Sequence, residues 1–253
     1  MRTPQSHTPR EKVLAEIRQR PDAGTRPAPE TSAAGAATMR VVGAAAIALA
    51  ASLVIENLVV LAGSPTYAAP LKEVLAFHAD HRVAVAIAVG LEALNVPLLL
   101  WFVTGLHGLV GRRGGAGADW SRLAVAAGAT FSAVMAFYAV LWDGVVLSAG
   151  ELTEPSPVLE LAWRMHAAAF AWSMAALGTT FIGAALATHA SRLTPPWQRL
   201  LGVAGAGLLL AAGAANLAIA DGSALLYVGV SGLAAWLVWL TATGVRLVRA
   251  QNS

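Results

Sequence analysis

The chain has 253 residues, of which 57% are hydrophobic and only 12% are charged, and this composition excludes a water-soluble globular protein because a soluble fold of that length cannot bury so much apolar surface. It has no cysteine, which excludes disulfide bonds, thiolate catalysis and thiolate metal sites. The formal net charge of +3 does not indicate a nucleic-acid partner, because in a membrane chain the basic residues belong to the cytoplasmic loops.

The N-terminal segment, residues 1–38, is polar and rich in Pro, Ala, Thr and charged residues, which predicts a disordered cytoplasmic tail. A short helix over residues 10–18 would have an apolar face of Val13, Leu14 and Ile17, which is too small for firm membrane binding. The apolar run after this tail is too long for a cleavable signal peptide, so we expect it to remain as a membrane span.

Apolar runs long enough to cross about 30 Å of hydrocarbon, roughly 20 residues each, occur six times after the tail. The sequence therefore predicts an all-α polytopic membrane bundle of six transmembrane helices over residues 39–250. The predicted spans are residues 39–63, 83–111, 123–150, 158–188, 197–220 and 224–248.

The placement of basic residues predicts the orientation of the bundle. Near one set of span ends lie Arg40, Arg112, Arg113, Arg122, Arg192, Arg199, Arg246 and Arg249. The opposite loops carry only Lys72 and Arg82 as basic residues, together with several acidic ones. Because cytoplasmic loops are enriched in Lys and Arg, we expect both termini in the cytoplasm and a multi-pass protein of the plasma membrane.

The loop over residues 64–82, on the predicted outer side, contains a short amphipathic stretch. In residues 71–82, Val74, Leu75 and Phe77 stand beside charged neighbours. This pattern predicts a short interfacial helix that leads into the second span.

The fifth predicted span contains small residues four positions apart. These are the pairs Gly202/Ala206 and Gly207/Ala211. Small residues at this spacing permit close approach of membrane helices, within the bundle or between copies in a homo-oligomer.

Ionisable residues inside the predicted spans are the main functional signal, because charged groups in hydrocarbon are costly and need partners. At a helical rise of 1.5 Å per residue, five of them lie roughly 9 to 13 Å from the outer ends of four different spans. Asn95 follows Glu92 by one turn on the same helix face. The sequence therefore predicts a polar pocket in the outer half of the membrane. Its candidate ligand-binding residues are Glu56, Glu92, Asn95, Asp143, Arg164 and His166.

Three interpretations of this polar layer remain open. The first is a pocket for a small polar ligand, a proton or a cation. The second is a structural network, in which Arg164 pairs with Asp143 or Glu160 and the remaining carboxyls are protonated or hydrogen-bonded. The third is a site for a hard divalent metal. Arg164 and His166 are two residues apart, about 200° around a helix, so they cannot both face one centre. We therefore predict no metal ion.

Common cofactors are not expected. His107 and His166 differ in depth by about 10 Å, so they cannot be the two axial ligands of one haem, and His107 is more consistent with a snorkelling or hydrogen-bonded residue. Retinal requires a lysine in the middle of a span, and the spans contain none. No phosphate-binding loop, zinc-protease helix or serine elbow occurs, and we assign no catalytic residue.

Several stretches resemble a family of six-span bacterial membrane proteins catalogued as a domain of unknown function and found in high-GC bacteria. The likeness covers residues 39–250. It is carried by Glu73–Arg82, Leu91–Pro97, Pro195-Pro196-Trp197, Trp236–Leu240 and Gly244–Leu247. The resemblance implies a six-helix bundle in a bacterial inner membrane, and it implies no particular activity or catalytic residue.

Two classes of function follow from the sequence. The first is a non-enzymatic membrane protein, such as a sensor, an accessory subunit or a transporter-like protein, whose polar layer binds a small ligand or an ion. The alternative is a membrane-embedded enzyme that acts on a lipid or an isoprenoid-type substrate, with Glu92 or His166 as general base. The alternative requires a lateral opening between helices at the depth of the polar layer. In either class the chain is in contact with membrane lipid.

Overall fold

The computed structural model describes residues 30–61, 63–149, 151 and 155–250. The chain divides into two units, Met1–Ala36 and Ala37–Ser253, and the helix bundle belongs to the second. The first 29 residues of the predicted tail lie outside the described residues. The tail prediction is wrong for residues 30–38, because a helix already begins at Glu30. The alanine-rich stretch Ala33–Ala37 has high helix propensity, which overrides the polar character that suggested disorder.

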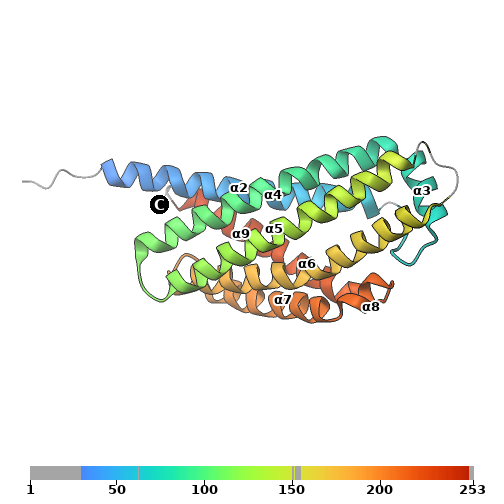
Figure 1. Cartoon of the computed structure of the whole chain (residues 1–253). Coiled ribbons are helices and arrows are strands. Elements are labelled where there is room, and N and C mark those ends of the chain that lie inside the picture. The colour runs from blue at the N-terminus through green and yellow to red at the C-terminus, as the bar shows by residue number, and fades with distance from the viewer. Residues whose placement is uncertain (1–29, 62, 150, 152–154, 251–253) are drawn as a thin grey trace, which may run out of the picture. The chain divides into compact units, whose positions relative to one another are not determined.

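Six helices of the described chain are long and apolar enough to cross a membrane, which confirms the predicted all-α, six-span architecture (Figure 1). They are α2 (Glu30–Leu61), α4 (Arg82–Arg113), α5 (Gly117–Ser148), α6 (Pro157–Ala190), α7 (Pro196–Ala214) and α9 (Leu226–Arg249). Two shorter helices, α3 (Leu71–Asp80) and α8 (Asn216–Ala220), lie in the connections.

The fifth predicted span differs most from the structure, because it is broken into α7 and α8 at Ala215. At the break, the Asn216 side chain donates a hydrogen bond from Nδ2 to the carbonyl oxygen of Gly213 at 3.0 Å. A short polar side chain that bonds to nearby backbone competes with the helical hydrogen-bond ladder. The helix therefore ends where hydropathy alone indicated an uninterrupted span.

Helix α6 is the central helix of the bundle and packs against α5, α7, α8 and α9. Glycines permit this close packing. A Cβ atom at Gly183 would lie 2.9 Å from the backbone nitrogen of Ala124 on α5, and one at Gly178 would lie 3.0 Å from the carbonyl oxygen of Ala206 on α7. Small residues let helix backbones approach closely in a membrane, where hydrophobicity does not drive helices together.

The two small-residue pairs of the fifth span have different surroundings. Gly202 and Ala206 are buried, and Gly202 packs directly against Ala185 of α6. Gly207 and Ala211 are exposed on the bundle surface. Only the first pair therefore serves packing inside the chain.

Helices α2 and α9 cross through a reciprocal glycine contact. A Cβ atom at Gly43 would lie 2.7 Å from the carbonyl oxygen of Gly244, and one at Gly244 would lie 2.8 Å from that of Gly43. Gly105 of α4 also faces Val42 of α2 without room for a side chain. Helix α2 is thus held against α4 and α9 by backbone-level contacts.

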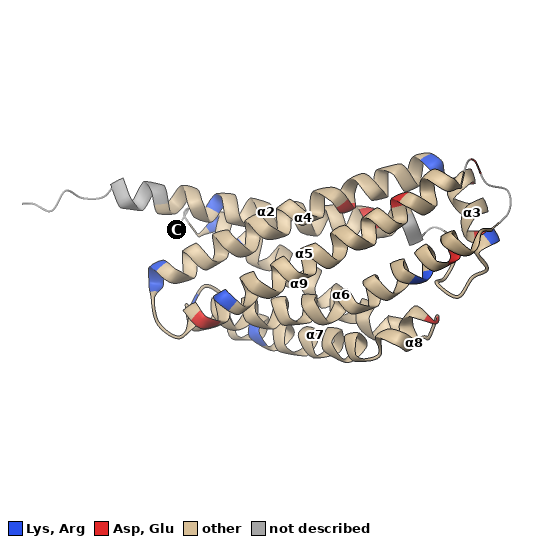
Figure 2. Ribbon diagram, viewed as in Figure 1, with Lys and Arg blue, Asp and Glu red and all other residues tan. Residues whose placement is uncertain are grey.

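At one end of the bundle, named the arginine end, long basic side chains fix the connection between α6 and α7. Arg113 donates from Nη1 to the carbonyl oxygen of Ser191 at 2.8 Å, and Arg246 donates from Nε to that of Leu193, also at 2.8 Å. Figure 2 shows basic residues gathered where α4 ends and α5 and α7 begin. The arginines that signalled orientation in the sequence therefore also hold a loop in place.

The opposite end, named the α3 end, is covered by the short helix α3. The predicted short helix in this loop is confirmed, and it packs onto the bundle. Leu71, Val74 and Leu75 of α3 form one apolar cluster with side chains of α5 and α6. The charged residues Lys72, Glu73 and Asp80 are exposed on the other face.

Between the two ends, four aromatic rings form a compact block in the core. Trp236 and Trp239 of α9 stack with ring centroids 5.5 Å apart and an interplanar angle of 10°. Phe102 of α4 and Phe181 of α6 meet both indoles edge-on, at centroid distances between 5.0 and 6.3 Å. All four are essentially fully buried.

Candidate ligand-binding site

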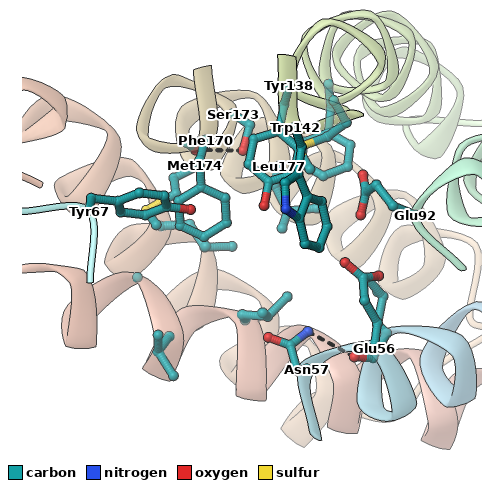
Figure 3. Close-up of a pocket in the computed structure, with 17 residues that line it drawn as sticks. Glu56, Asn57, Tyr67, Glu92, Tyr138, Trp142, Phe170, Ser173, Met174 and Leu177 are labelled. Atoms are coloured by element: carbon teal, nitrogen blue, oxygen red, sulfur yellow. Dashed lines mark hydrogen bonds between the residues drawn. The ribbon is translucent and has the colours of Figure 1, made fainter. Parts of the chain in front are cut away.

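A cavity of about 170 Å³ lies in the half of the bundle nearer to the α3 end. All six long helices contribute to its wall, together with Tyr67 from the loop before α3 (Figure 3). Most of the wall is apolar, with Phe131, Met135 and Leu177 among its members. Polar groups come from Glu56, Asn57, Tyr67, Glu92, Tyr138, Trp142 and Ser173. An apolar chamber with a few polar groups is the usual form of a small-molecule site.

A second, smaller cavity of about 40 Å³ adjoins the first. Glu92, Leu53 and Met135 belong to the walls of both, whereas Asn95 and Trp236 line only the smaller one. Glu92 therefore lies between the two spaces, and the smaller cavity reaches the aromatic block. A volume of this size accommodates one or a few water-sized groups.

The polar centre of the site consists of Glu56, Glu92 and Asn95. All three side chains are buried, with exposed fractions of 8%, 4% and 6%. Nδ2 of Asn95 donates to Oε2 of Glu56 at 2.6 Å. The two carboxyls point toward each other across the cavity wall (Figure 3). Because a carboxylate oxygen can only accept, a hydrogen bond between them requires a proton on one carboxyl.

The sequence places these three residues inside the bundle by helical spacing. On α4, Val85, Ala88, Glu92, Asn95 and Leu99 recur at intervals of three and four residues and are all buried. On α2, the buried stripe that contains Leu49 reaches Glu56 two turns later. Glu92, Asn95 and Glu56 therefore occupy positions that an apolar residue would fill in a purely structural stripe.

Among the residues that the structure describes, no basic side chain forms an ion pair with either carboxyl. Among the described residues, the ion pairs join Arg122 to Asp119 at 2.9 Å and Arg164 to Glu160 at 2.7 Å, and all four of these side chains are more than half exposed. Neither pair involves Glu56 or Glu92. A buried charge without an ionic partner is costly, so the site needs a proton or a cation from elsewhere.

Two of the six candidate residues do not join this centre. Arg164 is directed to the surface, where Nη2 donates to Oε1 of Glu160, as the structural interpretation predicted. Asp143 is half-buried and does not line either cavity. The rise per residue gives the depth of a side chain along its helix, but it does not give the direction in which that side chain points.

His166 is buried in a group of rings behind the cavity wall. Its imidazole stacks on Tyr138, with centroids 4.0 Å apart, and on Trp163, at 4.9 Å. Its Nδ1 lies 3.2 Å from the carbonyl oxygen of Tyr138. His166 lines neither cavity, so it is not placed to act as a general base on a molecule bound there.

The aromatic part of the site was missed by the sequence analysis. Tyr67, Tyr138, Trp142 and Phe170 all line the larger cavity. Tyr67 lies in a loop, yet its ring contacts Phe170 at a centroid distance of 5.6 Å. Burial raises the pKa of Tyr67, so its hydroxyl is a neutral hydrogen-bond donor at physiological pH. Helical spacing on α5 would have placed Tyr138 and Trp142 on one face, but no pattern indicates that a loop tyrosine folds inward.

His78 attaches α3 to the cavity wall. Its Nδ1 lies 2.7 Å from the carbonyl oxygen of Val74, and its Nε2 accepts a hydrogen bond from Nε1 of Trp142 at 2.9 Å. Burial lowers the pKa of the His78 imidazole, and the bond to the Val74 carbonyl opposes this shift only in part. The imidazole and the indole both belong to the ring group around His166.

Of the two roles predicted for His107, snorkelling or hydrogen bonding, the structure shows a hydrogen bond, which joins α4 to α5. Its Nδ1 lies 2.8 Å from Oγ of Ser121, whose hydroxyl donates to the carbonyl oxygen of Ala118. Within the part of the chain that the structure describes, no group of three or more His, Asp or Glu side chains is arranged to hold a metal ion.

A comparison with known proteins found no matching family model, no matching curated protein and no matching solved structure. The resemblance to a six-span bacterial family therefore stays a prediction, and the assignment of function depends on the geometry of the site.

Proposed function

We propose that this chain is a multi-pass membrane protein that binds a small molecule or ion in the cavity beside Glu56 and Glu92, as a sensor, an accessory subunit or a transporter-like protein. The observation that carries the proposal is the position of two buried carboxyls, without a basic partner in the described part of the chain, on the wall of a cavity of about 170 Å³. A protein cavity of about 150 Å³ holds a molecule the size of benzene. The ligand is therefore small.

A purely structural network explains the site less well. It accounts for the Arg164–Glu160 pair, but that pair lies at the surface. Glu56 and Glu92 stand beside unfilled volume, where side chains lose packing contacts and a buried polar group lacks partners. A bound ligand removes both costs.

The arginine distribution supports a plasma-membrane orientation in which the arginine end faces the cytoplasm. In this orientation α3, Tyr67 and the larger cavity belong to the outer half of the membrane. A ligand would then reach the site from outside the cell.

The proposal is tested by native mass spectrometry and elemental analysis of the full chain in lipid nanodiscs. We expect a stoichiometric small molecule or ion on the wild-type protein and its loss from the Glu92→Gln variant. Asp143→Asn is the matched control, because Asp143 belongs to the same half of the bundle but lines neither cavity. Wild-type protein that carries no bound species, or a species retained by Glu92→Gln, would contradict the proposal.

A further inference from the structure

Resting on the proposed function, we infer that the ligand is a primary ammonium compound with a compact apolar body, its ammonium group held between Glu56, Glu92 and Asn95. Three separate features of the site point to this chemical class. They are the charge of the carboxyl pair, the number of hydrogen-bond acceptors available to a ligand and the apolar and aromatic lining of the cavity.

The charge of the pair calls for one positive charge. A hydrogen bond between Glu56 and Glu92 needs one proton, and a pair with one proton carries a single negative charge, with which no described arginine or lysine forms an ion pair. A ligand with one ammonium group makes the buried site neutral. Desolvating an ion pair is acceptable only when the charges balance and the remaining hydrogen bonds are made.

The acceptors at the site match a group with three N–H donors. Oδ1 of Asn95 is buried and has no hydrogen-bond partner among the described residues, although its Nδ2 is bonded to Glu56. Asn95 is only 6% exposed and lines the smaller cavity beside Glu92. An unpaired buried acceptor is costly and indicates a missing donor. Carboxylate oxygens of Glu56 and Glu92 supply the other two acceptors for an ammonium, which donates three bonds.

The rest of the space suits an apolar body. The larger cavity is walled by Phe131, Met135, Phe170 and Leu177, and Tyr138 and Trp142 present aromatic rings beside the carboxyls. Aromatic faces attract cations, and burial of a hydrocarbon group against the apolar wall is favourable. The ammonium group fits where the two cavities adjoin at Glu92, with Glu56 on the wall of the larger cavity and Asn95 on that of the smaller one, and the larger cavity has room for a ring or a short branched chain.

The test compares benzylamine with benzyl alcohol, which has the same number of heavy atoms but no charge. Binding of each to the full chain in nanodiscs is measured by isothermal titration calorimetry at neutral pH, with empty nanodiscs subtracted. We expect the protonated amine to bind at least about tenfold more tightly than the alcohol, because hydrogen bonds to charged groups are the stronger ones. Glu92→Gln and Asn95→Leu should each remove most of that preference, and Asp143→Asn should keep it.

Equal binding of the two compounds, or a preference that survives in Glu92→Gln, overturns the ammonium assignment. Because the comparison of amine and alcohol uses the wild-type protein, it holds even when a variant fails to fold. Failure of benzylamine to bind, with a native bound species that Glu92→Gln releases, also overturns the ligand class and leaves the proposed function standing. Wild-type protein that binds neither probe and carries no native species rejects both.

Discussion

Trp142 donates a hydrogen bond to Nε2 of His78, and this single contact fixes the protonation state of the histidine. The indole N–H can only donate, and the Val74 carbonyl on the other side of the ring can only accept. His78 is therefore the neutral tautomer with its proton on Nδ1. A proton added at Nε2 would face the indole N–H, so protonation and the attachment of α3 to the cavity wall exclude each other.

This relationship predicts a pH dependence of stability. The pKa of His78 is lowered from its ordinary value of 6.5 because the side chain is buried. As the pH falls below about 6.5, His78 binds a proton in the unfolded chain but not yet in the folded protein, so the free energy of unfolding decreases. Above that range His78 is neutral in both states and contributes no pH dependence. Thermal unfolding in nanodiscs between pH 8 and pH 5 measures the effect.

Variants separate His78 from other titrating groups. His78→Gln keeps an acceptor for the Trp142 indole and removes the titration, so the loss of stability between pH 7 and pH 5 should become smaller. The matched control is His81→Gln, because His81 is an exposed residue one turn later. An unchanged pH dependence in His78→Gln would reject the explanation.

Asn95→Leu should destabilise the protein by about 1 to 3 kcal/mol. The amide supplies the hydrogen bond to Oε2 of Glu56, and its removal leaves that buried oxygen without this donor. Asn57→Leu is the control, because Asn57 is half-buried and its side chain donates to the carbonyl oxygen of Leu53 on its own helix at 2.8 Å. The melting temperatures of both variants, in the same nanodiscs, should rank with Asn95→Leu lower. Equal melting temperatures would contradict the assigned role of Asn95.

Gly43→Ala and Gly207→Ala should have opposite effects. A methyl group at Gly43 would lie 2.7 Å from a backbone oxygen of Gly244, so α2 and α9 must move apart, at a cost of about 1 to 3 kcal/mol. A Cβ atom at Gly207 would meet no atom of another described segment within 4 Å, and alanine there gains up to about 1 kcal/mol of helix propensity. Chemical or thermal denaturation gives the sign of each change. If Gly43→Ala leaves the free energy of unfolding unchanged, the prediction is wrong, and the crossing of α2 and α9 adjusts to the added methyl group.

Because the chain has no cysteine, its orientation can be tested with single introduced thiols. Glu151→Cys at the α3 end and Ala116→Cys at the arginine end both replace exposed residues. With the arginine end in the cytoplasm, a membrane-impermeant maleimide should label only the first variant in intact cells and both in lysed cells. Labelling of Ala116→Cys in intact cells would reverse the predicted topology.

The membrane spans could be predicted from sequence because hydropathy and length reflect the cost of placing polar groups in lipid. Depth was also accessible, since each residue adds a fixed rise, and Glu56, Glu92 and Asn95 indeed meet at one level. Depth alone grouped Arg164 with them, although its side chain lies on the exposed face of α6. Glu92 and Asn95 fall within the buried stripe of α4, whereas Arg164 falls outside the buried set of α6, so helical periodicity separates these cases where depth does not.

Other parts of the site depend on contacts between distant segments. Tyr67 reaches the cavity because its loop and α3 fold over the bundle, and no local periodicity encodes that fold. The break at Ala215 depends on one side chain of Asn216 that bonds to its own backbone. Such features follow from tertiary packing and from individual hydrogen bonds, which hydropathy does not report.

The block of Trp236, Trp239, Phe102 and Phe181 bears on whether this protein carries its ligand or only detects it. Trp236 lines the smaller cavity, and the other three rings pack against Trp236. A molecule that travelled from the cavity to the arginine end would have to part a closely packed group of rings on three helices. Detection requires no such rearrangement, since a ligand can arrive and depart on the near side. The aromatic block thus closes the cavity on the side of the arginine end. A measured rate of ligand passage would report how often the rings of the block move apart.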